Sequence, residues 1–185
     1  TDYSKIESLS KAGVFCLMSD VLGAEKPGTT PSESILTQII DSEMRNTAGK
    51  LLFTTYSSNI SRQNQVIAAA KKNGRKICFI GRSLLNAVGV AKKLGYLKID
   101  SGMEVDIKEL KSLPSQKIVL IVAGAQAQEG SALSRIVAGE VSDVTLLKAD
   151  TVIFSSDPIP GNEVSVYELV DEIAKIGAKV FYKDM

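Results

Sequence analysis

The stretch KLLFTTYSSNISRQNQVIAAAKKNGRKICFIGRS, residues 50–83, decides the fold. It begins with an apolar run, and a polar Ser-Ser-Asn turn leads from this run into a segment with helical spacing of apolar residues. Gly74 follows that segment, as glycine often follows a helix, and a second apolar run starts at residue 76. Two nearly continuous apolar strands joined by an amphipathic helix indicate a parallel sheet that is covered on both faces.

The same alternation continues on both sides of this stretch. We expect strands at residues 14–19, 50–56, 76–81, 117–124, 151–155 and 179–182. We expect helices at residues 59–74, 82–95, 131–139 and 162–177, and a short one at residues 105–113. A further helix should begin with a capping box, in which Thr30 is the N-cap, Pro31 is the first helical residue and Glu33 is the partner. The predicted fold class is α/β, with a doubly wound, mainly parallel, Rossmann-like sheet and helices on both faces.

Length and composition restrict the class of protein. A chain of 185 residues with 44% hydrophobic and 23% charged residues is typical of one globular domain. No apolar run approaches the ~20 residues of a membrane-spanning helix, and the N-terminus is neither a signal nor a transit peptide. Cys16 and Cys78 lie in apolar runs, so we interpret them as reduced core residues rather than as reactive thiols or metal ligands. These features predict a cytoplasmic protein with no membrane partner.

The sequence contains no histidine, which excludes several kinds of active site. Serine–histidine and cysteine–histidine nucleophilic pairs require it, and most protein zinc sites use histidine or clustered cysteine. Any hydrolytic chemistry must therefore be completed by residues outside this segment. The glycine fingerprints of dinucleotide and P-loop sites are missing from the sequence as well, which disfavours an NAD-type domain.

The basic residues are unevenly distributed, although the formal net charge is only +1. Residues 44–99 contain no acidic residue and eleven basic ones: Arg45, Lys50, Arg62, Lys71, Lys72, Arg75, Lys76, Arg82, Lys92, Lys93 and Lys98. This asymmetry predicts a polyanion-binding face, whose affinity for its ligand should fall steeply as salt rises. Lysines that end helices, such as Lys71 and Lys93, can equally be solvated residues that favour the helix dipole.

Small polar residues follow several of the expected strands. The candidate phosphate-binding residues are Ser57, Ser58, Asn59, Arg62, Arg82, Ser83, Ser155 and Ser156. Two of these loops lead into helix N-termini, where free amides and the helix dipole favour an anion. Serine and asparagine are also ordinary residues of helix caps and turns, but the convergence of several loops at one sheet edge favours a phosphate site.

Two acidic residues flank the loop after the first expected strand. Asp20 stands at the carboxyl end of residues 14–19, and it is either a metal or proton-transfer group or a turn-initiating aspartate. Glu33 fits the capping-box partner better than a catalytic group.

Several blocks together resemble the β-CASP insert of bacterial ribonuclease J. They are SSNISRQNQVIAAAKKNGRKICFIGRS, SALSRIVAGE and DTVIFSSDPIPGNEVSVYELVDEIAKIGAKV, in the order and spacing of that family. The resemblance covers essentially the whole chain and implies one β-CASP domain over residues 1–185, as part of a longer metallo-β-lactamase-fold protein. Such enzymes cut RNA with two zinc ions, as 5′-to-3′ exonucleases and sometimes as endonucleases.

The resemblance also implies roles for single residues. Asp20 matches the aspartate that bridges the two metals, Glu33 matches a carboxylate at the start of the insert, and Ser61 stands where active members carry histidine. The domain would clamp the RNA backbone and its 5′ monophosphate, with Arg62 and Arg82 on phosphate and the loop serines as donors. Zinc would be held mostly by ligands outside this segment.

Departures from the family pattern leave an alternative open. Ser61 replaces histidine, DVLG at residues 20–23 replaces a Ser-Thr-Asn turn, and AQAQE at residues 125–129 replaces a glycine-containing Ser-Gln-Gly-Glu run. Together these changes resemble the second, catalytically weak ribonuclease J paralogue of some bacteria. The leading hypothesis is the RNA-binding part of a zinc-dependent ribonuclease. The alternative is an inactive scaffold that forms a homo- or hetero-oligomer with ribonuclease J subunits.

Overall fold

The computed structural model describes residues 2–21, 24–25, 27–30 and 32–182. The chain divides into two units, Thr1–Ser32 and Glu33–Met185. The first unit includes α1 (Tyr3–Ala12), in which the Asp2 side chain caps the N-terminus by accepting a hydrogen bond from the Lys5 amide at 3.0 Å. The sheet belongs to the second unit.

Five parallel strands form this sheet, in the order β2-β3-β1-β4-β5. They are β1 (Leu51–Thr54), β2 (Lys76–Ile80), β3 (Ile118–Val122), β4 (Thr151–Phe154) and β5 (Lys179–Phe181). All residues of β1 and β3 are buried, as a strand covered on both faces requires. The predicted α/β fold with a parallel sheet is confirmed.

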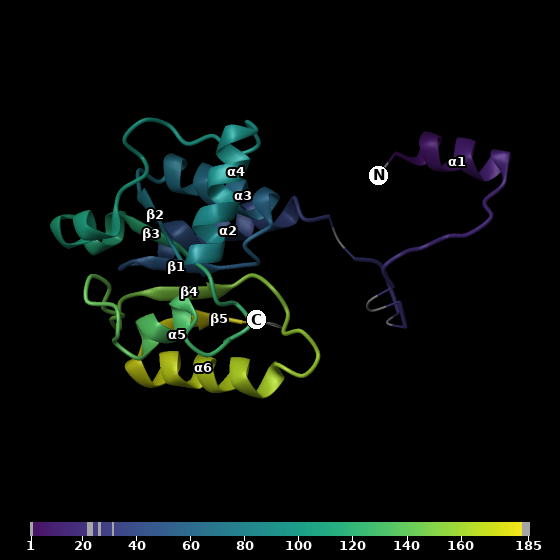
Figure 1. Ribbon diagram of the computed structural model, residues 1–185. Helices are drawn as coiled ribbons and strands as arrows, with labels where there is room; N and C mark the ends of the chain where they lie inside the picture. Colours follow the sequence, from purple (N-terminus) through teal and green to yellow (C-terminus); the bar gives the residue numbers. More distant parts are fainter. Residues whose placement is uncertain (1, 22–23, 26, 31, 183–185) are drawn as a thin grey trace. The chain divides into compact units, whose positions relative to one another are not determined.

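Helices cover both faces of the sheet (Figure 1). One face carries α2 (Ile35–Asn46), α3 (Ile60–Lys72) and α4 (Arg82–Lys93), and the other carries α5 (Ala132–Val137) and α6 (Glu163–Ile176). Two short 3-10 helices, η1 (Ile107–Ser112) and η2 (Ser115–Lys117), precede β3. Alternation along β1 divides the core, because Phe53 packs with α2–α4 and Leu52 packs with α5 and α6. Within the described residues, no helix combines the length and the apolar character that a membrane span requires.

A segment along the outer edge of β2 accounts for α3 and α4 sharing a face. Glu104 forms an isolated parallel bridge with Ile77. The Ile77 amide donates to the Met103 carbonyl at 2.8 Å, and the Val105 amide donates to the Ile77 carbonyl at 2.9 Å. The chain therefore reaches this edge after α4 and returns to β3 over the opposite face, where Leu110 of η1 joins the core. Right-handed crossovers that move in the same direction place their helices on the same face.

The strand expected at residues 14–19 does not form. These residues have no regular secondary structure and are exposed, Cys16 included. A buried strand needs neighbouring strands for its amides and carbonyls and apolar partners on both faces, and the described part of the first unit supplies neither. The interpretation of Cys16 as a core residue is therefore wrong. Cys78 in β2 is buried as predicted, and desolvation raises the pKa of its thiol to about 12.

α2 begins later than predicted. Its first residue is Ile35, so Thr30 is not its N-cap and Glu33 is not a capping-box partner, while Pro31 lies outside the described residues. Glu33 makes contacts with α3 instead. Its carboxylate lies 3.4 Å from an Arg62 nitrogen, and its carbonyl accepts a hydrogen bond from the Gln65 side chain at 3.0 Å.

Buried charged side chains form ion pairs and hydrogen bonds at the amino-terminal edge of the sheet. Lys50 Nζ lies 2.8 Å from Asp150 Oδ2, and the Lys50 amide donates to Asp150 Oδ1 at 2.7 Å. The buried guanidinium of Arg75 donates to three carbonyls near the end of α2, those of Met44, Thr47 and Gly49. These bonds satisfy groups that a helix end and a strand start leave unpaired.

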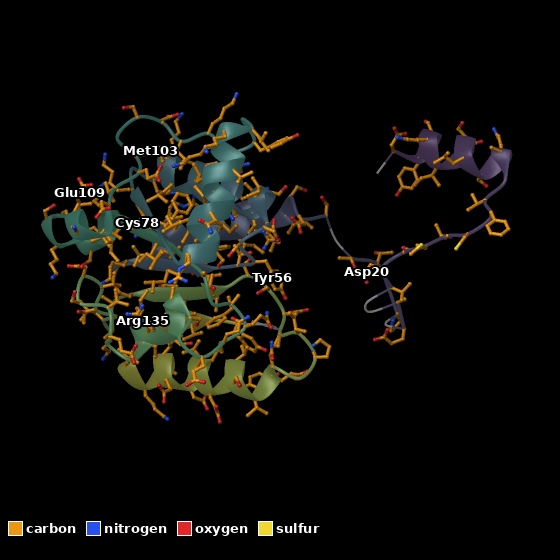
Figure 2. The ribbon with its side chains drawn as sticks, in the orientation of Figure 1. Asp20, Tyr56, Cys78, Met103, Glu109 and Arg135 are labelled. Atoms are coloured by element: carbon orange, nitrogen blue, oxygen red, sulfur yellow. The ribbon has the colours of Figure 1, made fainter. Side chains whose placement is uncertain are left out.

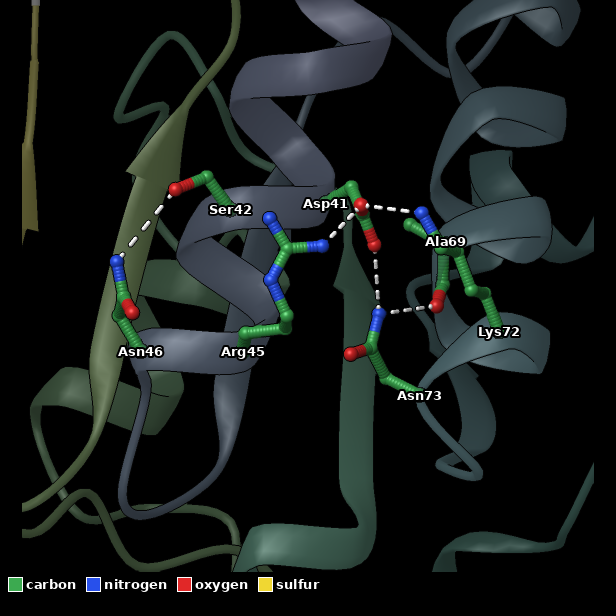
Figure 3. A network of polar contacts seen from close by, with 7 residues as sticks. All are labelled: Asp41, Ser42, Arg45, Asn46, Ala69, Lys72 and Asn73. Carbon is green, nitrogen blue, oxygen red and sulfur yellow. Dashed lines mark hydrogen bonds and ion pairs between the residues drawn. The ribbon is translucent and has the colours of Figure 1, made fainter.

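A second polar network joins α2 to α3 (Figure 3). The Asp41 carboxylate accepts hydrogen bonds from Lys72 Nζ at 2.7 Å, from Asn73 Nδ2 at 2.9 Å and from Arg45. These donors, Lys72 first, lower the pKa of Asp41 to about 2. The network therefore depends on an ionised carboxylate.

Candidate nucleic-acid interface

The carboxyl edge of the sheet gathers the loops that the sequence singles out. α3 leaves β1 on one face, while α6 leaves the adjacent β4 on the other face. Ligands of open α/β sheets bind where neighbouring connections diverge in this way. We call this edge the rim, and it consists of residues 55–63, 81–83, 123–131 and 155–162.

Two serines from different loops meet at the rim. Ser57 Oγ and Ser83 Oγ are 3.0 Å apart. The Asn59 side chain caps α3 by accepting the Arg62 amide at 3.0 Å. Gln63 is fully buried and donates to the Ser57 carbonyl at 2.9 Å, which holds the turn. The structure therefore brings these polar groups together, while their part in phosphate binding stays a prediction.

Arg62 lies beneath the rim surface rather than on it. The residue is only 6% exposed, its Nη1 donates to Ser155 Oγ, and its Nη2 lies 3.4 Å from Glu33 Oε1. Arg62 thus links α3 to the loop after β4 and orients Ser155. The expectation that Arg62 meets phosphate directly needs correction, because a ligand would reach the guanidinium only by displacing these partners.

Gln126 ties together three loops of the rim. It is 3% exposed, and its Nε2 donates to Tyr56 Oη at 3.1 Å and to the Asp157 carbonyl at 2.9 Å. Its Oε1 accepts the Ile159 amide at 2.7 Å. The next residue, Ala127, has a φ of 50°, a left-handed conformation that is strained for a residue other than glycine.

Several buried side-chain atoms at this edge have no hydrogen-bond partner among the described residues. They are Thr54 Oγ1, Thr55 Oγ1, Arg62 Nε, Gln63 Oε1, Gln65 Oε1 and Ser156 Oγ. Buried polar atoms in folded proteins are nearly always hydrogen-bonded to protein, ordered water or a ligand. All of these atoms are shielded from solvent, so a ligand at the surface of the rim does not reach them directly.

α4 begins at the rim with open amides. Its N-cap, Gly81, has a φ of 123°, and a Cβ there would lie 2.5 Å from the Cβ of Ala123, so glycine is required. No side chain of the described residues caps this helix. Arg82, its first residue, is exposed and forms no ion pair within the part of the chain that the structure describes. Free amides beside a guanidinium are groups that hold phosphate well.

The remaining predicted rim residues differ in exposure. Ser58 and Ser61 are exposed, in the turn before α3 and in its first turn. Ser155 is half-buried against Arg62, and the Ser156 hydroxyl is buried.

The basic run at residues 44–99 does not form one face of unpaired cations. Acidic residues from elsewhere in the sequence pair with much of it, in the ion pairs Arg45–Asp41, Lys50–Asp150, Arg62–Glu33, Lys71–Asp100, Lys72–Asp41 and Lys92–Glu104. Arg75 and Lys76 donate to backbone carbonyls. Arg82, Lys93 and Lys98 remain without an ion pair among the described residues, and Lys93 ends α4, about 16 Å along the helix axis from Arg82. The predicted polyanion face is therefore reduced at the rim mainly to Arg82.

The described residues do not fit a zinc centre by themselves. They contain no group of three or more His, Cys, Asp or Glu side chains that could hold a metal ion. Asp20, the predicted metal ligand, belongs to the first unit, and Glu33 pairs with Arg62 in the second. Protein zinc sites usually combine about four histidine, cysteine or carboxylate ligands, and this sequence has no histidine.

Three rim residues were not predicted from the sequence: Tyr56, Gln63 and Gln126. A signal existed for two of them, since Tyr56 directly precedes the serine turn and Gln126 follows the strand end at residues 117–124. The AQAQE run suggested lost polar groups, whereas Gln126 within it makes the hydrogen bonds that join the loops.

Comparison with known proteins relates this chain to ribonuclease J. A family model described as "Ribonuclease J, beta-CASP domain" matches residues 48–173. The chain is 37% identical over 181 residues to Ribonuclease J of Synechocystis sp. and 39% identical over 180 residues to Ribonuclease J of Mycolicibacterium smegmatis. It is 35% identical over 181 residues to Ribonuclease J2 of Bacillus subtilis. These alignments cover 97–98% of the chain but 28%, 32% and 33% of the relatives, so the chain spans about a third of their length.

Proposed function

Since the chain belongs to the β-CASP domain family of ribonuclease J, we propose that its rim binds the phosphate backbone and 5′ monophosphate of RNA for an RNA-processing ribonuclease. The observation that carries the proposal is the meeting of Ser57 and Ser83 beside the open N-terminus of α4. Hydroxyls, free amides and the Arg82 guanidinium together form a donor set suited to phosphate oxygens.

The comparison of two basic residues on one helix tests this proposal. Arg82→Ala removes an exposed cation at the rim, and Lys93→Ala removes an exposed cation at the other end of α4. We expect Arg82→Ala to weaken binding of single-stranded RNA by about fivefold, which corresponds to ~1 kcal/mol, and Lys93→Ala to change it little. Fluorescence anisotropy with RNA carrying either a 5′ monophosphate or a 5′ hydroxyl measures both effects.

The two RNA ends separate backbone binding from 5′-end binding. If the rim holds the terminal phosphate, Arg82→Ala removes most of the preference for the 5′ monophosphate. Equal losses from Arg82→Ala and Lys93→Ala would mean that binding is diffuse electrostatic attraction and that the rim is not the site.

The zinc-dependent hydrolysis that the resemblance implies needs ligands that the described residues do not provide. We therefore assign binding and orientation of RNA to this chain and derive no hydrolytic step from its residues. In this proposal the chain acts in the cytoplasm, beside metal ligands held elsewhere.

An inactive scaffold is the second candidate, and Ser61 favours it. This exposed residue lies in the first turn of α3 at the rim, where the resemblance places a histidine. A serine hydroxyl does not exchange protons near neutral pH as an imidazole does. The test is Ser61→His in the whole protein, with RNA turnover and co-elution with an active ribonuclease J subunit as the two measurements. Increased turnover supports the enzyme, whereas unchanged turnover with stable co-elution supports the scaffold.

A further inference from the structure

Tyr56 presents an aromatic ring at the rim. This residue, labelled in Figure 2, lies two positions after the end of β1 and directly precedes Ser57. It is 39% exposed. A single exposed aromatic residue is ordinary on a protein surface, but this one lies next to a candidate phosphate site and can offer its ring face to a ligand.

The polar end of Tyr56 is fixed while its ring remains partly exposed. Its hydroxyl donates to the Asp157 carbonyl at 3.2 Å and accepts from Gln126 Nε2 at 3.1 Å. Gln126 is itself held, because its Oε1 accepts the Ile159 amide at 2.7 Å. The Tyr56 carbonyl accepts the Asn59 amide at 2.9 Å. Backbone and hydroxyl are thus both anchored, so little side-chain freedom remains to be lost when a ligand binds.

We propose that Tyr56 is a stacking platform for a base of single-stranded RNA, and that Gln126 positions its ring. The inference rests on the proposed function, because it places a base against the ring when the neighbouring phosphate lies at the Ser57–Ser83 contact. Single-stranded RNA is bound in this way by many proteins, with aromatic rings for the bases and polar groups for the backbone. Stacking tolerates any base, because every base has an aromatic face.

The charges around Tyr56 favour stacking over a further phosphate contact. Asp157, whose carbonyl anchors the hydroxyl, is an exposed acidic residue of the loop after β4. A phosphate beside that carboxylate would be repelled, whereas the face of a neutral base would not.

Abasic RNA tests the inference directly. A short oligoadenylate with a 5′ monophosphate is compared with versions in which one nucleotide at a time lacks its base. We expect one such position to weaken binding to the natural sequence by about tenfold. In Tyr56→Leu the intact RNA should bind about tenfold more weakly, and the same abasic position should then have no further effect. Tyr56→Phe keeps the ring and loses the hydroxyl that anchors it, so its affinity for the intact RNA should lie between those of the natural sequence and Tyr56→Leu.

The matched control is Tyr96→Leu. Tyr96 is 70% exposed in the turn after α4, and its carbonyl accepts a hydrogen bond from Asn64, which lies outside the rim. Tyr96→Leu should leave the affinities for the intact RNA and for the abasic RNA unchanged. The inference is overturned if Tyr56→Leu remains as sensitive to the abasic position as the natural sequence, or if no position is sensitive in either. Failure of the natural sequence to bind any RNA would overturn the proposed function as well.

A spectroscopic variant covers the case in which Tyr56→Leu fails to fold. The sequence contains no tryptophan, so Tyr56→Trp introduces a single one. Stacking should quench its fluorescence with intact RNA and not with RNA that is abasic at the sensitive position. Tyr96→Trp should show no difference between the two RNAs, and equal quenching of Tyr56→Trp by both RNAs would overturn the inference.

Discussion

At the scale of single residues, one loop of the rim contains a residue whose backbone is strained because it carries a side chain in a left-handed conformation. Ala127 is the one non-glycine residue with a positive φ among the residues that the structure describes. It directly follows Gln126, whose amide joins three loops, so the strain accompanies the geometry that these hydrogen bonds require. The glycine in the Ser-Gln-Gly-Glu run of the family pattern would adopt this conformation more easily.

Ala127→Gly should therefore stabilise the protein by ~0.5 kcal/mol, since relief of the left-handed strain outweighs the added freedom of glycine in the unfolded chain. Urea unfolding measures the change. Ala138→Gly is the control, because Ala138, the residue after α5, has a φ of −70° and carries no left-handed strain, so its replacement should only lower the stability of the protein. A loss of stability at both positions would contradict the strain at Ala127.

Substitution in the buried ion pair of Lys50 and Asp150 should lower the stability of the protein far more than substitution at Ala138. Asp150 is 1% exposed and accepts hydrogen bonds from the Lys50 amide and the Leu147 amide in addition to its ion pair. Asp150→Ala leaves a buried ammonium group without its partner, and we expect a loss of about 3–5 kcal/mol in unfolding free energy. Thermal and urea unfolding measure it.

The exposed pair of Lys71 and Asp100 provides the comparison. Asp100→Ala should change the unfolding free energy by less than about 1 kcal/mol, because water screens this pair. Similar losses for Asp100→Ala and Asp150→Ala would mean that burial does not set the strength of these contacts.

At the scale of elements, the pairing of α2 with α3 should depend on pH. Asp41 has a pKa lowered to about 2 by Lys72, Asn73 and Arg45, against an ordinary value of 3.8. A carboxyl group whose pKa falls on folding adds stability that is complete above its unfolded pKa and is lost as the pH falls toward the folded one.

The stability advantage of the natural protein over Asp41→Asn should therefore be constant near neutral pH and shrink between about pH 4 and pH 2. Urea unfolding of both proteins over this range measures the difference. Ser42→Ala on the same helix serves as control, since it removes no charge and should show no such trend. An advantage that grows on acidification would reverse the assigned sign.

The elements also show how far the sequence alone could go. Apolar runs with helices between them were sufficient to predict all five strands, because a parallel strand needs apolar residues on both faces. The same rule failed for residues 14–19, which have the composition of a buried strand but no neighbouring strand in the described part of their own unit. The composition of a segment shows only that it is able to form a buried strand, whereas strand formation also requires a neighbouring strand with which to pair.

The candidate site was predictable to a similar degree. The meeting of Ser57 with Ser83 follows from the parallel order of the strands, since all carboxyl ends share one edge. The burial of Arg62 and the hydrogen bonds of Gln126 depend on partners 93 and 70 residues away in the chain, which no local pattern specifies.

At the scale of the whole molecule, the distribution of charge revises the expected salt dependence. Eight of the eleven basic residues in the run at residues 44–99 are engaged in ion pairs or in hydrogen bonds to carbonyls. Eleven phosphate contacts would give a slope of about −8 for log affinity against log salt with single-stranded RNA. The three remaining cations allow a slope of about −2 at most.

Binding of single-stranded RNA over a series of salt concentrations measures this slope. Arg82→Ala should bring it closer to zero by about 0.7, the contribution of one phosphate contact. A slope near −8 would mean that the ion pairs open when RNA binds and that the original prediction of a broad basic face was right.

The bridge between Ile77 and Glu104 has a consequence for self-association. Because the amide and carbonyl of Ile77 are already hydrogen-bonded to residues 103 and 105, a strand from a neighbouring molecule cannot pair with β2 at Ile77. The chain's own backbone thus occupies this part of the outer edge of β2, and charged residues such as Glu104 and Lys76 lie along it. Changes that separate this segment from β2 would leave the amide and carbonyl of Ile77 unpaired and would favour association between molecules at this edge.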